Sequence, residues 1–128
     1  YISGLNPHSG DGGKIGKEEL TIIFPAIKKL KDMGLNVRGP FPGDTLFQKN
    51  KIKEYDVAVC MYHDQALIPI KTLYSGNIIN ITLGLDFIRT SPDHGTALDI
   101  AGERKADPSS LVLAIKKAED LIYKKYVK

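Results

Sequence analysis

The sequence has few of the features that mark secreted or membrane proteins. Its single cysteine, Cys60, excludes an internal disulfide, and a lone thiol in an apolar stretch is typical of a core residue in a reducing compartment. No apolar run approaches the roughly 18 residues that a membrane-spanning helix requires, and the first residues show no signal-peptide pattern. We therefore expect a cytoplasmic protein with no membrane partner.

The net charge of the chain is also small. Eighteen basic residues against fifteen acidic ones leave a formal net charge of +3, and the lysines are scattered along the chain. This pattern argues against a nucleic-acid partner, although a local basic pocket for a phosphorylated small molecule is compatible with it. The 128 residues, 42% of them hydrophobic, are enough for one domain with its own core.

Stretches of two kinds alternate along the chain. β-Branched runs predict strands, and apolar residues at helical spacing predict helices. The expected strands are 35–38, 55–60 and 77–83, and the expected helices are 17–33, 65–74 and a last one capped by 108–110. Pro25 and Pro69 should kink the first two helices, because proline lacks the backbone N–H. This order predicts a single α/β domain over residues 1–128, with some parallel pairing.

Residues 6–16 form a glycine-rich loop that contains neither of the common phosphate-binding motifs. A dinucleotide fingerprint would need glycine at 10, 12 and 15, but position 15 is isoleucine. A P-loop that ended in Gly16-Lys17 would need glycine at 11 and Ser or Thr at 18, where the sequence has aspartate and glutamate. By composition the loop favours a flexible turn, and His8 is its candidate functional residue.

The pentapeptide Met61-Tyr62-His63-Asp64-Gln65 directly follows the expected strand 55–60. In open α/β sheets, ligands bind at the carboxyl ends of the strands. Polar and titratable side chains at this point therefore mark a candidate site. An isolated His-Asp pair could also be an ordinary loop contact. Polar residues elsewhere in the chain are therefore needed to choose between a functional site and a loop contact.

Polar side chains also follow other apolar elements, and the full set is His8, His63, Asp64, Lys71, Asn80, Arg89, Asp93 and His94. Two histidines with a carboxylate or a third histidine would suit Zn²⁺, Mn²⁺ or Co²⁺ if the fold brought them together. Lys71 and Arg89 are candidate partners for a phosphate or carboxylate. Asn80 needs a polar partner if its strand is buried. Ordinary surface or core positions remain the alternative for each of these side chains.

Five segments resemble one known family. They are 5–13, 39–45, 61–65, 80–85 and 89–96, in this order and at compatible spacing. They resemble the 4-hydroxythreonine-4-phosphate dehydrogenases, NAD-dependent enzymes of pyridoxal phosphate (vitamin B6) biosynthesis. Members of that family are much longer. The resemblance therefore implies that this chain is the C-terminal portion of a two-domain enzyme.

The resemblance also assigns roles to individual residues. His8 and His63 match two of the three histidines that bind the family's divalent metal (Zn²⁺, Mg²⁺, Mn²⁺ or Co²⁺), and the third lies outside this chain. Lys71, Asn80 and Arg89 match positions that contact the phosphorylated substrate, and Lys71 is also the candidate for proton transfer. The family's site lies at a subunit interface, so the resemblance implies a homodimer.

The family shares the fold of isocitrate and isopropylmalate dehydrogenases, which is not a Rossmann fold and holds NAD by a different loop. Residues 94–102 are similar to the adenosine-binding loop of those enzymes. By this analogy Asp99 contacts a ribose hydroxyl, and His94 contacts the adenosine end together with Gly95 and Thr96. Position 98 is leucine where the isopropylmalate enzymes have proline. NAD is the expected cofactor, and NADP is the alternative.

The activity implied by the resemblance is oxidation of 4-phosphohydroxy-L-threonine with loss of CO₂, which gives 3-amino-2-oxopropyl phosphate. A paralogue that acts on threonate or erythronate 4-phosphate is a close alternative, since it would use the same metal, NAD and phosphate contacts. A third hypothesis is that the 128 residues alone form a non-catalytic, dimerising α/β domain, because two of three metal ligands leave the site incomplete.

Overall fold

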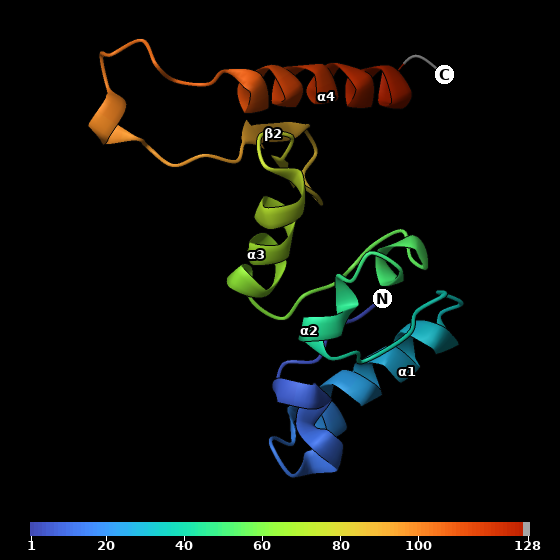
Figure 1. Cartoon of the computed structure of the whole chain (residues 1–128). Helices are drawn as coiled ribbons and strands as arrows, with labels where there is room; N and C mark the ends of the chain where they lie inside the picture. Colours follow the sequence, from blue (N-terminus) through green and yellow to red (C-terminus); the bar gives the residue numbers. More distant parts are fainter. Residues whose placement is uncertain (127–128) are drawn as a thin grey trace. The chain divides into compact units, whose positions relative to one another are not determined.

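The structure, a computed structural model, describes residues 1–126. The chain divides into two compact units, Tyr1–Pro69 and Ile70–Lys128. Figure 1 labels the α-helices and strand β2 (Arg89–Pro92). The division falls inside a helix, next to Pro69. Within the described residues, no helix combines the length and the apolar character needed to cross a membrane.

In the first unit, the N-terminal segment lies between two others in parallel pairing. Isolated parallel bridges join Ile2 to Val59 and Ser3 to Phe41. The N–H of Ile2 donates to the carbonyl oxygen of Arg38 at 2.9 Å, and the N–H of Ser3 donates to that of Val59 at 2.9 Å. The parallel pairing predicted from the sequence is thus confirmed, as single bridges. Because the three segments are parallel, the chain leaves all of them at the same edge.

Helices and turns follow these segments. They are η1 (Pro7–Gly13), η2 (Glu19–Ile23), α1 (Phe24–Asp32), α2 (Gly43–Leu46), η3 (Lys51–Lys53) and α3 (His63–Tyr74). The expected helix 17–33 is present as the π-type turn η2 followed directly by α1, and Pro25 is the second residue of α1, at the junction of the two. Ile23 and Ile27 pack with Ile2 into the small core of this unit.

The second unit is a two-stranded antiparallel sheet covered by a helix. Strand β1 (Ile79–Thr82) pairs with β2 (Arg89–Pro92), so that Asn80 lies opposite Ser91. Helix α4 (Ser109–Tyr126) packs against both strands and runs alongside β2 in Figure 1. The hydroxyl of Thr90 fixes this contact by donating to the carbonyl oxygen of Ala114 at 2.9 Å. The turn η4 (Leu98–Ile100) lies in the loop between β2 and α4.

Two predicted strands of the first unit are wrong. The run 55–60 makes only the bridge at Val59, and the structure assigns no strand to 35–38. A run that is apolar at nearly every position predicts a strand covered on both faces, but Val57 and Val59 are 64% and 49% exposed. Cys60, expected in the core, is only half-buried.

The second unit also differs from the sequence prediction. Strand 77–83 is confirmed as the shorter β1, but Asn80 is exposed and needs no buried partner. Strand β2 lies in a stretch for which the sequence predicts no strand. Its residues lack the apolar alternation of a strand, so pairing with β1 forms it rather than local propensity. Helix 65–74 is confirmed and begins two residues earlier, at His63.

Candidate functional site

His8 lies in η1, a turn with an unusual backbone. His8, Ser9 and Asp11 have φ values of 52°, 52° and 42°. The adjacent Gly10 and Gly12 are also at positive φ. The left-handed region costs roughly 1–2 kcal/mol for each residue that carries a Cβ. Such a run persists only where surrounding contacts hold it. The flexible turn expected from composition is therefore a defined, strained turn in the structure.

A buried carboxylate lies directly behind this turn. Glu19 Oε1 accepts the N–H groups of Leu5 at 2.8 Å and Asn6 at 2.7 Å, and Glu19 Oε2 accepts Asn6 Nδ2 at 2.8 Å. The side chain of Glu19 is almost completely buried, at 1% exposed. Burial raises the pKa of Glu19, but the hydrogen bonds from Asn6 and Leu5 outweigh it and lower the pKa below its ordinary value. The residue is therefore held as an anion.

The amide of Asn6 joins two carboxylates. Besides its bond to Glu19, Asn6 Nδ2 donates to Glu18 Oε2 at 2.7 Å. This bond is the main cause of a lowered pKa at Glu18. Both hydrogens of the amide nitrogen are thus engaged, and the orientation of the Asn6 side chain is fixed.

His63 is the exposed first residue of α3. Two residues later, Gln65 Oε1 accepts the N–H of Met61 at 2.8 Å, and Gln65 Nε2 donates to the carbonyl oxygen of Gly4 at 2.8 Å. Gly4 ends the central parallel segment, just before the turn that carries His8. The turn of His8 and the helix of His63 therefore start from the same edge and are tied together there.

Two imidazoles at one edge fit part of a divalent-metal site. The side chains of His8 and His63 are both exposed, and a neutral imidazole nitrogen is a good ligand for Zn²⁺ or Co²⁺. Among residues 1–126, no group of three or more His, Cys, Asp and Glu side chains is placed to hold a metal ion. The two histidines therefore fit a metal as members of a larger ligand set.

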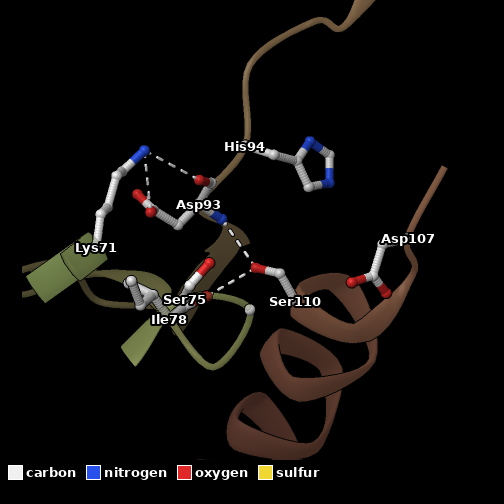
Figure 2. A pocket seen from close by; sticks show the side chains of 8 residues that line it. Lys71, Ser75, Ile78, Asp93, His94, Asp107 and Ser110 are labelled. Carbon is white, nitrogen blue, oxygen red and sulfur yellow. Dashed lines mark hydrogen bonds and ion pairs between the residues drawn. The ribbon is translucent and has the colours of Figure 1, made fainter. Parts of the chain in front are cut away.

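Lys71 lies in a pocket of about 300 Å³ in the second unit, shown in Figure 2. Its ammonium group contacts Asp93 Oδ2 at 3.2 Å and donates to the carbonyl oxygen of Asp93 at 3.4 Å. The side chain of Lys71 is 51% exposed, whereas that of Asp93 is 8% exposed. Lys71 can therefore meet a ligand from solvent, while Asp93 offsets part of its positive charge.

Ser110 of α4 also lines this pocket and forms hydrogen bonds with two backbone groups. Its hydroxyl donates to the carbonyl oxygen of Ile78 at 2.7 Å and accepts the N–H of Asp93 at 3.0 Å. Figure 2 shows the hydroxyl between these two backbone groups. One side chain of α4 thus fixes the segment that follows β2 and presents Asp93 to Lys71.

Asp107 caps α4, in place of the expected 108–110. Its Oδ1 accepts the N–H of Ser109 at 2.9 Å and the hydroxyl of Ser109 at 2.6 Å. These two bonds, and to a lesser degree the charge of His94, lower the pKa of Asp107. A carboxylate at this position also suits the positive end of the helix dipole.

The three predicted substrate residues do not share one pocket. Arg89 lines a separate, mainly apolar pocket of about 330 Å³, and its Nη1 donates to Thr82 Oγ1 at 2.8 Å. Asn80 is exposed on β1. In the structure, Lys71 therefore has Asp93 as its charged neighbour, and neither Arg89 nor Asn80 lines its pocket.

The predicted cofactor loop contributes one residue to the Lys71 pocket. His94 lines it, and the Nδ1 atom of His94 lies 3.1 Å from the carbonyl oxygen of Gly95. The other members of the predicted set are exposed and lie outside the lining of this pocket: Gly95, Thr96 and Asp99. The structure thus unites one predicted substrate residue with one predicted cofactor residue.

Sequence reasoning missed Asn6, Glu19 and Ser110. A signal for Glu19 was present, because it precedes Ile23 and Ile27 at intervals of four and so shares their buried helix face. A carboxylate on such a face requires hydrogen-bond donors from another segment. No comparable pattern marks Asn6 or Ser110, whose partners are backbone or carboxylate groups far away in the sequence.

Comparison with known proteins finds relatives over nearly the whole chain. A family profile described as "Pyridoxal phosphate biosynthetic protein PdxA" matches residues 1–118. The chain is 60% identical over 117 residues to the 4-hydroxythreonine-4-phosphate dehydrogenase of Bradyrhizobium diazoefficiens, a match that covers 91% of this chain and 34% of that relative. The chain therefore spans about a third of the length of this relative.

Solved structures agree with this match. The crystal structure of the 4-hydroxythreonine-4-phosphate dehydrogenase from Klebsiella pneumoniae is similar with a TM-score of 0.78 and 47% identity, over 91% of this chain and 35% of that one. A terephthalate 1,2-cis-dihydrodiol dehydrogenase from Burkholderia xenovorans is similar with a TM-score of 0.67 and 38% identity, over 91% and 37% of the two chains. The resemblance found in the sequence is thereby confirmed.

Proposed function

This chain belongs to the pyridoxal phosphate biosynthetic protein PdxA family, and we propose that it forms part of the active site of a 4-hydroxythreonine-4-phosphate dehydrogenase. The proposed reaction is NAD-dependent, divalent-metal-dependent oxidation of 4-phosphohydroxy-L-threonine with decarboxylation, giving 3-amino-2-oxopropyl phosphate. We also propose that the complete protein has the isocitrate and isopropylmalate dehydrogenase-like fold and acts as a cytoplasmic homodimer. Names of close relatives support this proposal.

One observation in the structure carries the proposal: the parallel pairing of the first unit starts the turn of His8 and the helix of His63 from one edge. His8 and His63 would hold the divalent metal through their imidazoles, each in its neutral form. A metal held there would supply Lewis-acid polarisation of the substrate hydroxyl, and NAD would supply the acceptor for the hydride. Among Zn²⁺, Mg²⁺, Mn²⁺ and Co²⁺, two imidazole ligands favour Zn²⁺ and Co²⁺, because these metals bind nitrogen well.

Lys71 is the proposed contact for the substrate's phosphate. Its ammonium group is half exposed and already bound to Asp93 on one side, so that a phosphate would approach from the solvent side. Lys71 is also the proposed proton-transfer group, a role that lysine side chains take in general acid–base catalysis. Asn80 and Arg89 remain proposed substrate contacts, and His94, Gly95, Thr96 and Asp99 remain proposed contacts for NAD or NADP.

Metal binding by the chain tests the role of the histidines. The chain contains three histidines, so His94→Ala is a matched control for His8→Ala and His63→Ala. Calorimetric titration with Zn²⁺ should show that each of the two ligand variants raises Kd at least tenfold, while His94→Ala leaves it within about twofold. Equal Zn²⁺ affinity in all three variants would reject the metal site.

Binding of inorganic phosphate tests the role of Lys71. Lys71→Met should weaken phosphate binding roughly tenfold, the value of one charge-assisted hydrogen bond. Asp93→Asn should strengthen it, because removing the neighbouring anion leaves the ammonium group free for the ligand. Lys105→Met is the control, since this exposed lysine pairs with the nearby Glu103 and lies outside the lining of the Lys71 pocket. Unchanged binding in Lys71→Met would remove Lys71 from the phosphate site.

A different substrate is the second candidate, favoured by the similarity to the terephthalate dihydrodiol dehydrogenase. A dehydrogenase named for a different substrate is thus similar to this chain in both sequence and structure. Threonate and erythronate 4-phosphate are the phosphorylated alternatives. A panel of these compounds, assayed for NADH formation with a complete protein that carries this sequence, distinguishes them. The 128-residue chain alone is expected to form no NADH.

A further inference from the structure

We propose that Glu19 is a positioning residue for His8, acting through a three-residue clasp that consists of Glu19, Asn6 and Glu18. This inference rests on the proposed role of His8 as a metal ligand and extends it to a residue behind the loop. Glu19 itself touches neither substrate nor metal in this proposal. Its task is to hold the left-handed turn so that the imidazole of His8 is presented from the edge shared with His63.

The turn needs such a support, because its own backbone disfavours it. His8, Ser9 and Asp11 all carry a Cβ and all lie at positive φ. Left to local preferences, these residues would return to the right-handed or extended regions. Some other part of the protein must therefore offset the unfavourable backbone.

Glu19 makes the contacts that can do this. Its carboxylate takes both successive N–H groups that enter the turn, those of Leu5 and Asn6, on a single oxygen. It is buried at 1% exposure, so that water does not replace these bonds when they break. Hydrogen bonds to a buried anion are also stronger than those between neutral groups.

Two glycines show how closely the turn lies on this carboxylate. A Cβ at Gly10 would lie 2.7 Å from Glu19 Oε2, and one at Gly4 would lie 3.1 Å from Glu19 Oε1. Both contacts are closer than ordinary van der Waals distance. The backbone before and inside the turn is thus laid directly against the side chain that binds it.

The Asn6 amide is the hydrogen-bond donor of the clasp, so its two partners must be acceptors. Both hydrogens of its nitrogen are used, one toward Glu18 and one toward Glu19. An amide at position 19 would keep an oxygen for the two backbone N–H groups but would turn an NH₂ toward the NH₂ of Asn6. Asn6 could then reverse, but its oxygen would face the carboxylate of Glu18. The single change Glu19→Gln is therefore unfavourable, and the pair Glu18→Gln with Glu19→Gln removes the conflict.

The experiment compares Zn²⁺ affinity of the chain with Glu19→Gln, with the double variant Glu18→Gln/Glu19→Gln, and with Glu54→Gln as the control. Glu54 is an exposed glutamate that pairs with Lys51. Glu19→Gln should raise Kd at least tenfold, as for loss of a residue that orients a ligand. The double variant should recover most of this loss, and the control should stay within about twofold. A role of Glu19 in stability alone would leave the Zn²⁺ affinity of the folded variants unchanged.

The absorption spectrum of bound Co²⁺ and amide hydrogen exchange at Leu5 and Asn6 complete the test. Glu19→Gln should change the Co²⁺ spectrum and speed exchange at both amides, and the double variant should reverse both effects. If Glu19→Gln does not fold, Asn6→Ala takes its place, since it keeps the backbone N–H bonds and should still raise the Zn²⁺ Kd severalfold. Unchanged Zn²⁺ affinity in the folded variant overturns the inference.

The result for His8→Ala separates the two proposals. If His8→Ala weakens Zn²⁺ binding and Glu19→Gln does not, the metal site stands and the positioning role fails. If His8→Ala has no effect on Zn²⁺ binding, the proposed metal site fails and the positioning role fails with it, whatever hydrogen exchange shows for the clasp.

Discussion

Gln65 donates from Nε2 to the carbonyl oxygen of Gly4 at 2.8 Å, across 61 positions of the sequence. The same side chain accepts the N–H of Met61 through Oε1. One amide thus connects the start of α3 with the end of the segment that leads into the His8 turn. His63 lies between Met61 and Gln65 in the sequence, and these two residues are joined by the hydrogen bond to Gln65 Oε1.

Gln65→Met is expected to destabilise the chain by about 1–3 kcal/mol, because it removes two hydrogen bonds, one with the N–H of Met61 and one with the carbonyl oxygen of Gly4, which then keeps only the Ser3 hydroxyl as a donor among the described residues. Methionine keeps the length of the side chain, so that little packing is lost. Urea denaturation measures the change in the free energy of unfolding. Gln48→Met, at an exposed glutamine, is the control and should change it by less than about 0.5 kcal/mol. Equal values for the two variants would show that the link is unimportant.

The contribution of Glu19 to stability should depend on pH. The pKa of Glu19 is lowered in the folded state below its ordinary value of 4.5, because the hydrogen bonds from Asn6 and Leu5 outweigh the effect of burial. The folded protein therefore holds this proton less tightly than the unfolded chain, so that the stabilisation is complete above pH 4.5 and is lost as the pH falls through the folded pKa. Urea denaturation of the chain and of Glu19→Gln should show a stability difference that shrinks on acidification.

Glu54→Gln provides the comparison for this pH series. Lys51 and then Tyr1 lower the pKa of Glu54 by hydrogen bonding, but Glu54 is exposed. Solvent screens such a pair, so that the variation with pH should be smaller than for Glu19. A stability difference for Glu19→Gln that is constant from neutral to acidic pH would contradict the assignment of Glu19 as a buried anion.

Ser9→Gly and Ser9→Ala should both stabilise the chain. The hydroxyl of Ser9 is buried and has no hydrogen-bond partner among the described residues, so Ser9→Ala should gain about 1 kcal/mol. Ser9→Gly also removes the Cβ at φ 52°, which should add about 0.5–1 kcal/mol after the greater chain entropy of glycine is subtracted. Thermal unfolding of the two variants measures the order wild type, alanine, glycine. A less stable glycine variant would argue against strain at this position.

Ser110→Ala should destabilise the second unit by about 2–3 kcal/mol, because the hydroxyl joins the carbonyl oxygen of Ile78 to the N–H of Asp93. The neighbouring Ser109→Ala is the matched control. The Ser109 hydroxyl donates to the exposed Asp107, and its loss should cost about 1 kcal/mol or less. Hydrogen exchange at the Asp93 amide locates the effect, and fast exchange is expected in Ser110→Ala alone. Identical exchange in both variants would rule out this role for Ser110.

Local patterns in the sequence predicted the α/β class, some parallel pairing, the long helices and the family. Helical spacing of Ile23 and Ile27 and the β-branched run before Asn80 are local patterns, and local patterns follow from backbone geometry alone. The five family-like segments likewise needed only the order of residues. The strand β2 was not predictable in this way, because its polar residues are held as a strand by their partner across the sheet.

Which side chains meet follows from the folded chain and not from local sequence patterns. Glu19 reaches Leu5 and Asn6, Gln65 reaches Gly4, and Ser110 reaches Ile78, each over more than ten positions of the sequence. Such contacts depend on where segments lie in space, and a polar residue carries no local mark of a distant partner. The sequence therefore named His8 and His63 as candidates, and the folded chain shows the buried carboxylate and the amide that hold the segments carrying them.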